Sequence, residues 1–459
     1  MTKTLFDSFN KVTSKEWKSQ IQFELKGADY NDTLVWESLE GIKVRPFYHS
    51  DEDFNPTAVP TKASAFKVLQ TIYVFDLQKS IDKALDSLER GAESLHFTID
   101  TQSINSVELL SALPFQKTEI YITLGFLSFE YLQKIEVWAK ENKANIHVLV
   151  DPIAELAKDG NWFTNLNEDF AIATKINQEL NYCSTLAVNA EIYQNAGATM
   201  VQQLAYTLAH LNEYFNRIPQ KAQTILVQVA VGSNYFFEIA KLRALRLLLD
   251  TLAKEYHSGI TFKIMAKPSK RNKTIYDYNV NMLRTTTECM SAILGGADTV
   301  TNLPYDVLFH KDNEFGDRIA RNQLLVLKEE SYFNAVDNPA EGAYYIENLT
   351  HQLAEKGLEL FKDIERNGGF ITQLIEGTIQ RKIAQSAEKE QELFDQGKEV
   401  LLGTNKYPNT QDHMAGDLEL YPFVKVNPRK TLIVPIIAKR LAEKIELKRL
   451  EEEKKTTQQ

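Results

Sequence analysis

The sequence predicts an α/β fold in which eight parallel strands close into a (β/α)8 TIM barrel, with an extended N-terminal arm and a helical C-terminal extension. Between residues 71 and 302, short runs rich in Val, Ile, Thr and aromatic residues alternate with amphipathic helical stretches. This alternation is typical of parallel strands joined by right-handed crossovers, and eight such units are the number at which a parallel sheet closes. An open doubly wound sheet is the competing architecture, but no GxGxxG motif follows the first strand.

The expected strands have the length and the β-rich composition of barrel strands. They cover residues 71–75, 95–99, 119–124, 146–150, 185–188, 225–231, 261–265 and 299–302. The helices between them carry apolar residues at i, i+3, i+4 and i+7 spacing, which predicts one buried face. They cover residues 80–90, 129–141, 199–215 and 236–253.

The regions before and after the barrel have a different pattern. Residues 1–65 contain a short helix that Ser14 is expected to cap, and extended pieces at 34–36 and 42–48. We interpret this region as an arm that contacts a partner subunit; the alternative is a first segment packed on its own domain. Helices are expected after the barrel at 318–330, 350–366, 371–394 and 437–455. The predicted organisation is therefore an arm at 1–65, a TIM-barrel domain at 66–370 and a helical extension at 371–459.

Composition excludes several classes of protein. The formal net charge of −10 argues against non-specific binding to nucleic acid or to an anionic membrane. There is no run of 18 apolar residues and no secretory leader pattern, so we expect a cytoplasmic protein that does not span a membrane. Two cysteines, Cys183 and Cys289, are too few for a disulfide scaffold or a Cys-rich metal site.

Residue types that carry chemistry show no catalytic or metal-binding spacing. The eight histidines form no HxxxH or HExxH motif, which argues against a metal site. His96 and His147 lie in expected strands, where a structural role is the commoner one. Asp151 follows the fourth strand, where barrel enzymes place catalytic groups, but it also precedes Pro152 as a helix cap would. If the chain is a barrel enzyme of unrelated chemistry, its candidate residues are Asp151, Asn189 and Lys267.

Several stretches, in order from about residue 15 to residue 450, match a single family. They include ELKG at 24–27, EIAKLRA at 238–244, VNMLRTT at 280–286, GGADTVT at 295–301, DNPAEGAYY at 337–345 and GTNKYP at 403–408. Together they resemble the methylmalonyl-CoA mutases, and the stretches at 280–286 and 295–301 look like the family's small-subunit version.

The resemblance implies an isomerase complex of propionate metabolism that interconverts succinyl-CoA and methylmalonyl-CoA. Catalytic chains of the family thread CoA through a TIM barrel and carry adenosylcobalamin on a C-terminal flavodoxin-like domain. In many bacteria the catalytic chain pairs with a related small chain that carries no cofactor.

This sequence departs from the catalytic pattern. It lacks the Asp-x-His-x-x-Gly signature whose imidazole ligates cobalt, and it ends where the linker to the cobalamin domain would begin. Ile192 stands where catalytic chains have a histidine that contacts the substrate thioester, and Val300 stands where they have a second histidine before a Thr-Asn pair. Neither side chain can donate a hydrogen bond to a developing oxyanion. The resemblance therefore implies no catalytic residue, no cofactor site and no metal site in this chain.

The expected function is that of the small, non-catalytic subunit of a heterodimeric methylmalonyl-CoA mutase, inactive alone, with adenosylcobalamin in the partner large subunit. The isolated chain could also form a homodimer, because the surface that binds the related large subunit could bind a second copy of this chain. The alternative is an active acyl-CoA mutase barrel whose cobalamin domain is a separate protein.

We also expect side chains to plug the barrel axis, because bulky pairs such as Leu149-Val150 and Ile264-Met265 occupy the strands. Thr98, Thr123 and Gln228 could also face inward, and alternation along the strands does not settle which residues do.

Overall fold

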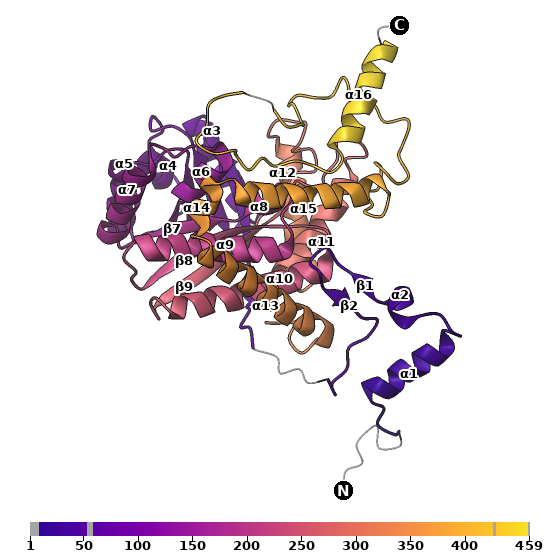
Figure 1. Ribbon diagram of the computed structural model, residues 1–459. Coiled ribbons are helices and arrows are strands. Elements are labelled where there is room, and N and C mark those ends of the chain that lie inside the picture. The colour runs from indigo at the N-terminus through magenta and orange to yellow at the C-terminus, as the bar shows by residue number, and fades with distance from the viewer. Residues whose placement is uncertain (1–8, 53–57, 426–427, 458–459) are drawn as a thin grey trace.

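The computed structural model describes residues 9–52, 58–425 and 428–457. Eight parallel strands form a closed barrel in which the last strand pairs with the first, so the predicted TIM barrel is confirmed (Figure 1). The strands are β3 (Lys67–Tyr73), β4 (Ser94–Ile99), β5 (Glu119–Leu124), β6 (Ile146–Val150), β7 (Ser184–Asn189), β8 (Gln223–Val231), β9 (Ile260–Pro268) and β10 (Thr299–Val300).

The first strand lies four residues earlier than predicted. It starts at Lys67, where its pairing with Thr299 of β10 closes the barrel, and it ends at Tyr73. The apolar residues after Tyr73 leave the sheet because Asp76 caps the next helix, its side chain accepting a hydrogen bond from the backbone N–H of Lys79.

Helices cover the outside of the barrel, and most begin at an Asp, Asn, Ser or Thr cap. They are α3 (Leu77–Glu89), α4 (Ser106–Ser111), α5 (Phe129–Asn142), α6 (Pro152–Asp159), α7 (Leu166–Glu179), α8 (Glu191–Asn195), α9 (Met200–Arg217), α10 (Tyr235–Lys254), α11 (Val280–Leu294) and α12 (Glu314–Leu325), which continues into a π-helical turn at Val326–Glu330. Their apolar faces and the outward-facing strand residues form the main hydrophobic core.

The C-terminal extension contains α13 (Tyr344–Arg366), α14 (Phe370–Ile375), α15 (Thr378–Asp395) and α16 (Glu443–Thr457). α13 packs along α9 and α10. The single helix predicted at 371–394 is two helices, because Gly377 adopts a left-handed conformation with φ of 71° between α14 and α15. The last helix starts at Glu443, six residues later than predicted (Figure 1). Its Leu450 packs with Ile275 and Phe309 from the loops after β9 and β10. Within the described ranges, no helix is both long and apolar enough to cross a membrane.

The N-terminal arm consists of α1 (Ser14–Glu24), α2 (Tyr30–Leu34) and a two-stranded antiparallel sheet of β1 (Trp36–Glu37) and β2 (Lys43–Val44). A 3₁₀ turn at Ala63–Ala65 leads into the barrel. The cap of α1 is Thr13 rather than the predicted Ser14, because Thr13 and Glu16 form a reciprocal capping box. α1 lies apart from the barrel, whereas the β1–β2 sheet lies beside it (Figure 1).

Candidate functional site

The carboxyl ends of the barrel strands surround a cavity of about 170 Å³, at the place where barrel enzymes bind their substrates. Its lining is mostly polar and comes from six strands and the start of α8: Leu69, Thr71, His96, Thr98, Thr123, Asn189, Glu191, Gln228, Met265, Ala266, Lys267 and Thr301. We call it the mouth cavity. The structure thus brings together Asn189 and Lys267, two of the three residues proposed for an unrelated barrel chemistry.

Charged groups at the mouth act on one another across short distances. Burial, and to a lesser extent the nearby Lys267 ammonium, lower the pKa of His96 to about 3, so this imidazole is neutral; it is hydrogen-bonded to Thr123 at 2.8 Å. Burial raises the pKa of Glu191, while Lys267 and Lys270 oppose that rise. The Lys270 pKa is lowered to about 8, chiefly by burial and then by Lys267.

A buried apolar layer lies below the mouth cavity and fills the middle of the barrel. It consists of Leu69, Tyr121, Leu149, Ala187, Leu226 and Met265, none more than 6% exposed. The predicted plug is therefore present, with Leu149 and Met265 pointing inward, whereas Val150 and Ile264 belong to the outer core. Thr98, Thr123 and Gln228 face the mouth cavity above this layer.

The amino-terminal end of the barrel is closed by a cluster of paired charges. The carboxylate of Glu119, 2% exposed, contacts Nε2 of His147 at 2.7 Å, Nζ of Lys67 at 3.0 Å and the ammonium of Lys263. Burial opposes ionisation of Glu119, but hydrogen bonds from His147 and Lys263 outweigh it and leave the Glu119 pKa well below its usual range. His147 is thus a structural residue in this cluster.

Asp151 forms a buried network beside the mouth. Its Oδ1 accepts hydrogen bonds from the N–H of Ala154 at 2.9 Å and the hydroxyl of Tyr214 at 2.6 Å, and lies 2.8 Å from Nε2 of His210. Its Oδ2 accepts from the N–H of Asn189 at 2.6 Å. Burial would raise the Asp151 pKa, but the His210 charge and these hydrogen bonds lower it overall. Asp151 is therefore the cap of α6 and a clamp between β6, β7 and α9, with its oxygens already engaged.

The two positions where catalytic relatives are expected to have histidines lie outside the mouth cavity lining. Ile192 lies on α8 and packs against the main core, partly buried. Val300 is fully buried in the outer core, because Thr299 and Thr301 on either side of it take the inward positions. Neither side chain supplies a polar group to the barrel interior.

A second cavity of about 250 Å³ joins the mouth cavity along Leu69, Thr71, Lys267 and Thr301. It extends between the β10–α12 loop and the start of α12, where Asp306 pairs with His310 at 3.1 Å. Buried Arg321 also lines it and donates to Gln70 at 3.0 Å. Burial raises the pKa of Asp317, near its rim, to about 6 despite the adjacent Lys83.

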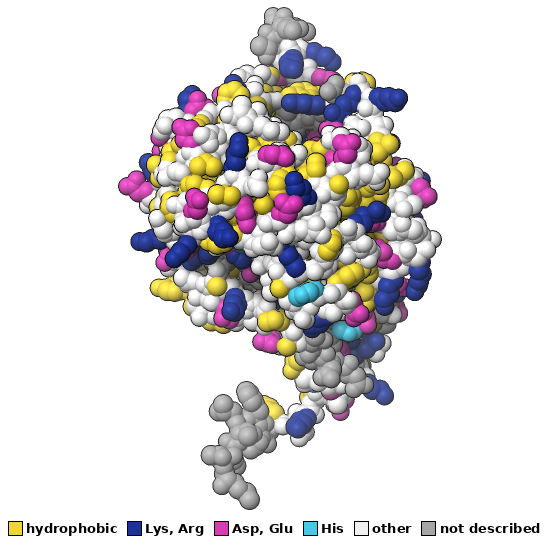
Figure 2. Space-filling view, turned by 90° about the vertical axis from the view of Figure 1, so that its left-hand side faces the viewer, with side chains coloured by type: hydrophobic (Ala, Val, Ile, Leu, Met, Phe, Trp, Pro, Cys, Tyr) yellow, Lys and Arg dark blue, Asp and Glu magenta, His cyan; other side chains and the backbone are white. Residues whose placement is uncertain are grey.

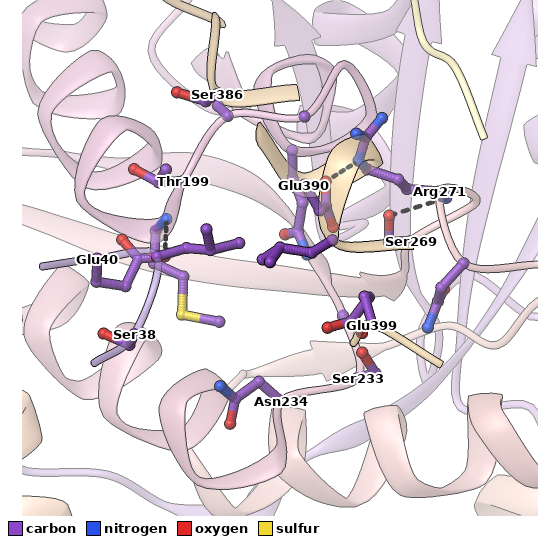
Figure 3. Close-up of a pocket in the computed structure, with 18 of the residues that line it drawn as sticks. Ser38, Glu40, Thr199, Ser233, Asn234, Ser269, Arg271, Ser386, Glu390 and Glu399 are labelled. Carbon is purple, nitrogen blue, oxygen red and sulfur yellow. Dashed lines mark hydrogen bonds and ion pairs between the residues drawn. The ribbon is translucent and has the colours of Figure 1, made fainter. Parts of the chain in front are cut away.

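A third and larger cavity, of about 670 Å³, lies between the arm and the barrel (Figure 3). The arm contributes residues 36–40, and the opposite wall comes from loops after β8 and β9 and from α15. Glu40 reaches across to α9, where its carboxylate accepts hydrogen bonds from the N–H groups of Met200 and Val201, both at 2.8 Å. On the far side, Arg271 is paired with Glu390 at 2.5 Å (Figure 3). This cavity is rich in acids and has no histidine in its lining.

The cofactor that the family resemblance implies does not fit these cavities. The two cavities that contain a histidine, His96 or His310, measure about 170 and 250 Å³ and are too small for a corrin ring. The large cavity offers no imidazole to cobalt. In the described ranges, no group of three or more His, Cys, Asp or Glu side chains is placed to hold a metal ion.

Comparison with known proteins identifies one family. The family model described as methylmalonyl-CoA mutase matches residues 97–442. The methylmalonyl-CoA mutase small subunit of Porphyromonas gingivalis is 35% identical over 90% of this chain and 72% of its own length. The Streptomyces virginiae small subunit is 28% identical over 88% of this chain and 72% of its own length. The methylmalonyl-CoA mutase of Rhizobium meliloti is 27% identical, and this chain spans 64% of its length.

Solved structures with a detectable likeness are distant. A dipeptide epimerase from Methylococcus capsulatus has a TM-score of 0.30 at 10% identity, covering 56% of this chain and 63% of that chain. A dihydropteroate synthase from Coxiella burnetii has a TM-score of 0.32 at 13% identity, covering 66% of this chain and all of that chain. At this distance the likeness says nothing about function.

Proposed function

The chain belongs to the methylmalonyl-CoA mutase family, and we propose that it is the small, non-catalytic subunit of a heterodimeric mutase. In this proposal the partner large subunit carries adenosylcobalamin and the catalytic residues. This chain binds the large subunit and stabilises it, since a partner that binds only the folded state shifts the folding equilibrium toward that state.

The observation that carries the proposal is the packed barrel axis. The layer of six side chains led by Tyr121, Leu149 and Leu226 fills the middle of the barrel, and the paired charges around Glu119 close its amino-terminal end. Protein interiors packed in this way leave no room for a chain of methylene and amide groups such as pantetheine. An acyl-CoA therefore cannot reach the mouth along the axis without unpacking the barrel.

The replaced polar positions support the same proposal. Loss of a single donor that stabilises a developing oxyanion costs about 10²–10³ in rate. Ile192 offers no such donor, and Val300 faces the outer core. A chain with both features has no means of binding a transition state more tightly than the substrate.

The arm supports the proposed role in assembly. No residue of α1 is buried, and Trp17 and Phe23 on this helix are 52% and 80% exposed. Exposed aromatic side chains are the residues that most often anchor protein interfaces. Glu40 fixes the β1–β2 region to α9, and α1 before it keeps most of its side-chain surface available to a partner, with Trp17 also contacting Phe47 of the arm.

The test compares the chain alone with the chain co-expressed with a family large chain. We expect no turnover of succinyl-CoA by the isolated chain with added adenosylcobalamin, and a one-to-one complex with activity after co-expression. Variants Trp17→Ala and Phe23→Ala should weaken complex formation in size measurements without changing the thermal midpoint of the isolated chain.

Two outcomes would contradict this proposal. Turnover by this chain together with only a separate cobalamin-binding protein would favour the alternative, an active barrel with a detached cofactor domain. A stable homodimer that never exchanges with a large chain would remove the proposed partner.

A further inference from the structure

The mouth cavity contains an ammonium group with no partner. Lys267 projects from the end of β9, is about half buried, and makes no hydrogen bond or ion pair with any described residue. The two lysines at the opposite end of the barrel interior do have a partner, since Lys67 and Lys263 both bind Glu119. Glu191 lines the same cavity as Lys267 and acts on it through space, but no ion pair joins the two. An ammonium group that is partly removed from water without a direct ion pair favours a bound anion.

Neutral hydrogen-bonding groups around Lys267 are also unpaired within the described chain. Gln228, only 8% exposed, directs its amide into the cavity and has no side-chain partner. The hydroxyl of Thr98 is likewise unpaired, and Asn189 uses only its amide oxygen, which accepts from the N–H of Glu191 at 3.1 Å. Gln228 is the buried residue of this set, and a buried amide normally has a hydrogen-bonding partner. With Lys267, Thr98 and Asn189 it presents hydrogen-bonding groups to one cavity, an arrangement that suits a bound polar molecule.

The charge of the site limits that molecule. The lining holds the Lys267 ammonium, a neutral imidazole at His96 and the carboxyl group of Glu191. Lys267 and Lys270 both act on Glu191, so two ammonium groups face one carboxyl group at the mouth. One further negative charge balances this set, which favours a singly charged carboxylate over a doubly charged phosphate. Amide and hydroxyl donors beside an ammonium form the charge-assisted hydrogen bonds that carboxylates accept.

The size and floor of the cavity limit it further. A volume of about 170 Å³ corresponds to roughly six water molecules at about 30 Å³ each. Leu69 and Met265 form an apolar floor beneath the polar rim. A ligand that fills this space has a charged head and a short hydrocarbon tail, and it must enter from the mouth because the layer below is closed.

We propose that the mouth cavity is a binding site for a small monocarboxylate, with the carboxylate on Lys267, Gln228 and Asn189 and the alkyl group on Leu69 and Met265. The site takes the free acid anion, because the CoA thioester of the same acid has no carboxylate for Lys267 to bind. This inference concerns the barrel of this chain alone and does not depend on whether the chain pairs with a large subunit.

The experiment is calorimetric titration of the isolated full-length chain with acetate, propionate and butyrate, and with inorganic phosphate, at constant ionic strength. We expect saturable binding of the carboxylates at one site per chain and none of phosphate. Lys267→Met should weaken binding at least about tenfold, the loss expected for one charge-assisted contact. Gln228→Leu should weaken it by a smaller factor.

The matched control is Lys254→Met, which removes an exposed positive charge in the last turn of α10, outside the cavity lining, and should change the affinity less than about twofold, as expected for a screened surface charge. Thermal unfolding of each variant reports whether it folds.

Binding of phosphate without binding of acetate, propionate or butyrate would show that the ligand is not a monocarboxylate. Absence of any binding, or binding by Lys267→Met equal to the unsubstituted chain, would overturn the site. Binding of propionyl-CoA would instead count against the proposed non-catalytic role, because it would show that this barrel holds an acyl-CoA, so the two proposals fail by different results.

Discussion

The two ends of the barrel carry charged side chains on the same strands but treat them differently. At the amino-terminal end, Glu119 is surrounded by Lys67, Lys263 and His147, and each charge has a partner. At the carboxyl end, Lys267 shares a cavity with Glu191 but makes no ion pair or hydrogen bond with any residue that the structure describes. The paired charges are part of the core and close the amino-terminal end of the barrel. The groups without a direct partner at the carboxyl end are available to a bound ligand. Pairing, rather than charge itself, distinguishes structural polar groups from candidate binding groups.

On the face in Figure 2, lysines and arginines are interspersed with acids, and exposed ion pairs contribute little to stability. The contrast between the barrel ends therefore arises inside the fold, where burial makes each missing or present partner matter.

The largest expected loss of stability comes from removing Glu119, the carboxylate that the charged groups at the amino-terminal end of the barrel share. Glu119→Ala leaves the neighbouring lysines and His147 without their shared carboxylate, and a buried charge cluster that loses a partner is strongly destabilised. We expect the free energy of unfolding to fall by about 2–4 kcal/mol, measured by urea denaturation. Lys67→Met, which changes a half-exposed partner, should cost clearly less. Equal stability of Glu119→Ala and the parent chain would mean that the cluster does not close this end.

An intermediate effect on stability, dependent on pH, is expected from His96 in the mouth cavity. Its pKa is lowered from 6.5 to about 3 by burial and then by Lys267, so the unfolded chain takes up a proton at pH values where the folded chain does not. Stability from this residue is present above pH 6.5 and is lost as the pH falls toward 3. Between pH 6.5 and 5 the loss is roughly 1.5 kcal/mol.

The check on His96 is His96→Gln, which cannot titrate in this range. The variant should lose less stability than the parent chain over the same pH interval, as measured by urea denaturation at each pH. Parallel pH profiles for the two proteins would show that His96 is not neutral in the folded barrel.

The smallest expected effect on stability comes from Lys267 itself. Because its ammonium has no partner to lose, Lys267→Met should change the free energy of unfolding by less than about 0.5 kcal/mol or raise it slightly. Lys241→Met is the comparison variant, because Lys241 is 3% exposed and paired with Glu238 at 2.6 Å. Removing this buried partner should lower the free energy of unfolding severely. A severe loss on substituting Lys267 would reveal a structural role and weaken the contrast between the ends.

Local sequence pattern was enough to predict the barrel and all eight of its strands, because strand–helix alternation and β-rich composition are local properties. The start of β3 was misplaced, since its first residue is defined by pairing with β10, more than 200 residues away. The break at Gly377 was missed because the apolar spacing continues across it. For Asp151, the sequence was compatible with both a catalytic role and a helix cap. Its contacts with His210 and Tyr214 favour the helix cap, and only the structure shows them.

The candidate site was predicted only in part. Asn189 and Lys267 were named from their positions at strand ends, and the structure brings them together. Which strand residues face inward was not decided by the sequence, so Gln228 stayed an option among several and Val300 was interpreted as part of a lost active site although it faces the outer core. That Lys267 lacks a partner depends on every neighbouring strand, and no local pattern contains this information.

The carboxylate of Glu40 gives the arm mechanical access to the barrel. It holds the first turn of α9, and two turns and more further along the same helix His210 and Tyr214 grip Asp151 at the end of β6. The arm and the rim of the strands are therefore attached to the same helix, α9, at positions more than two turns apart.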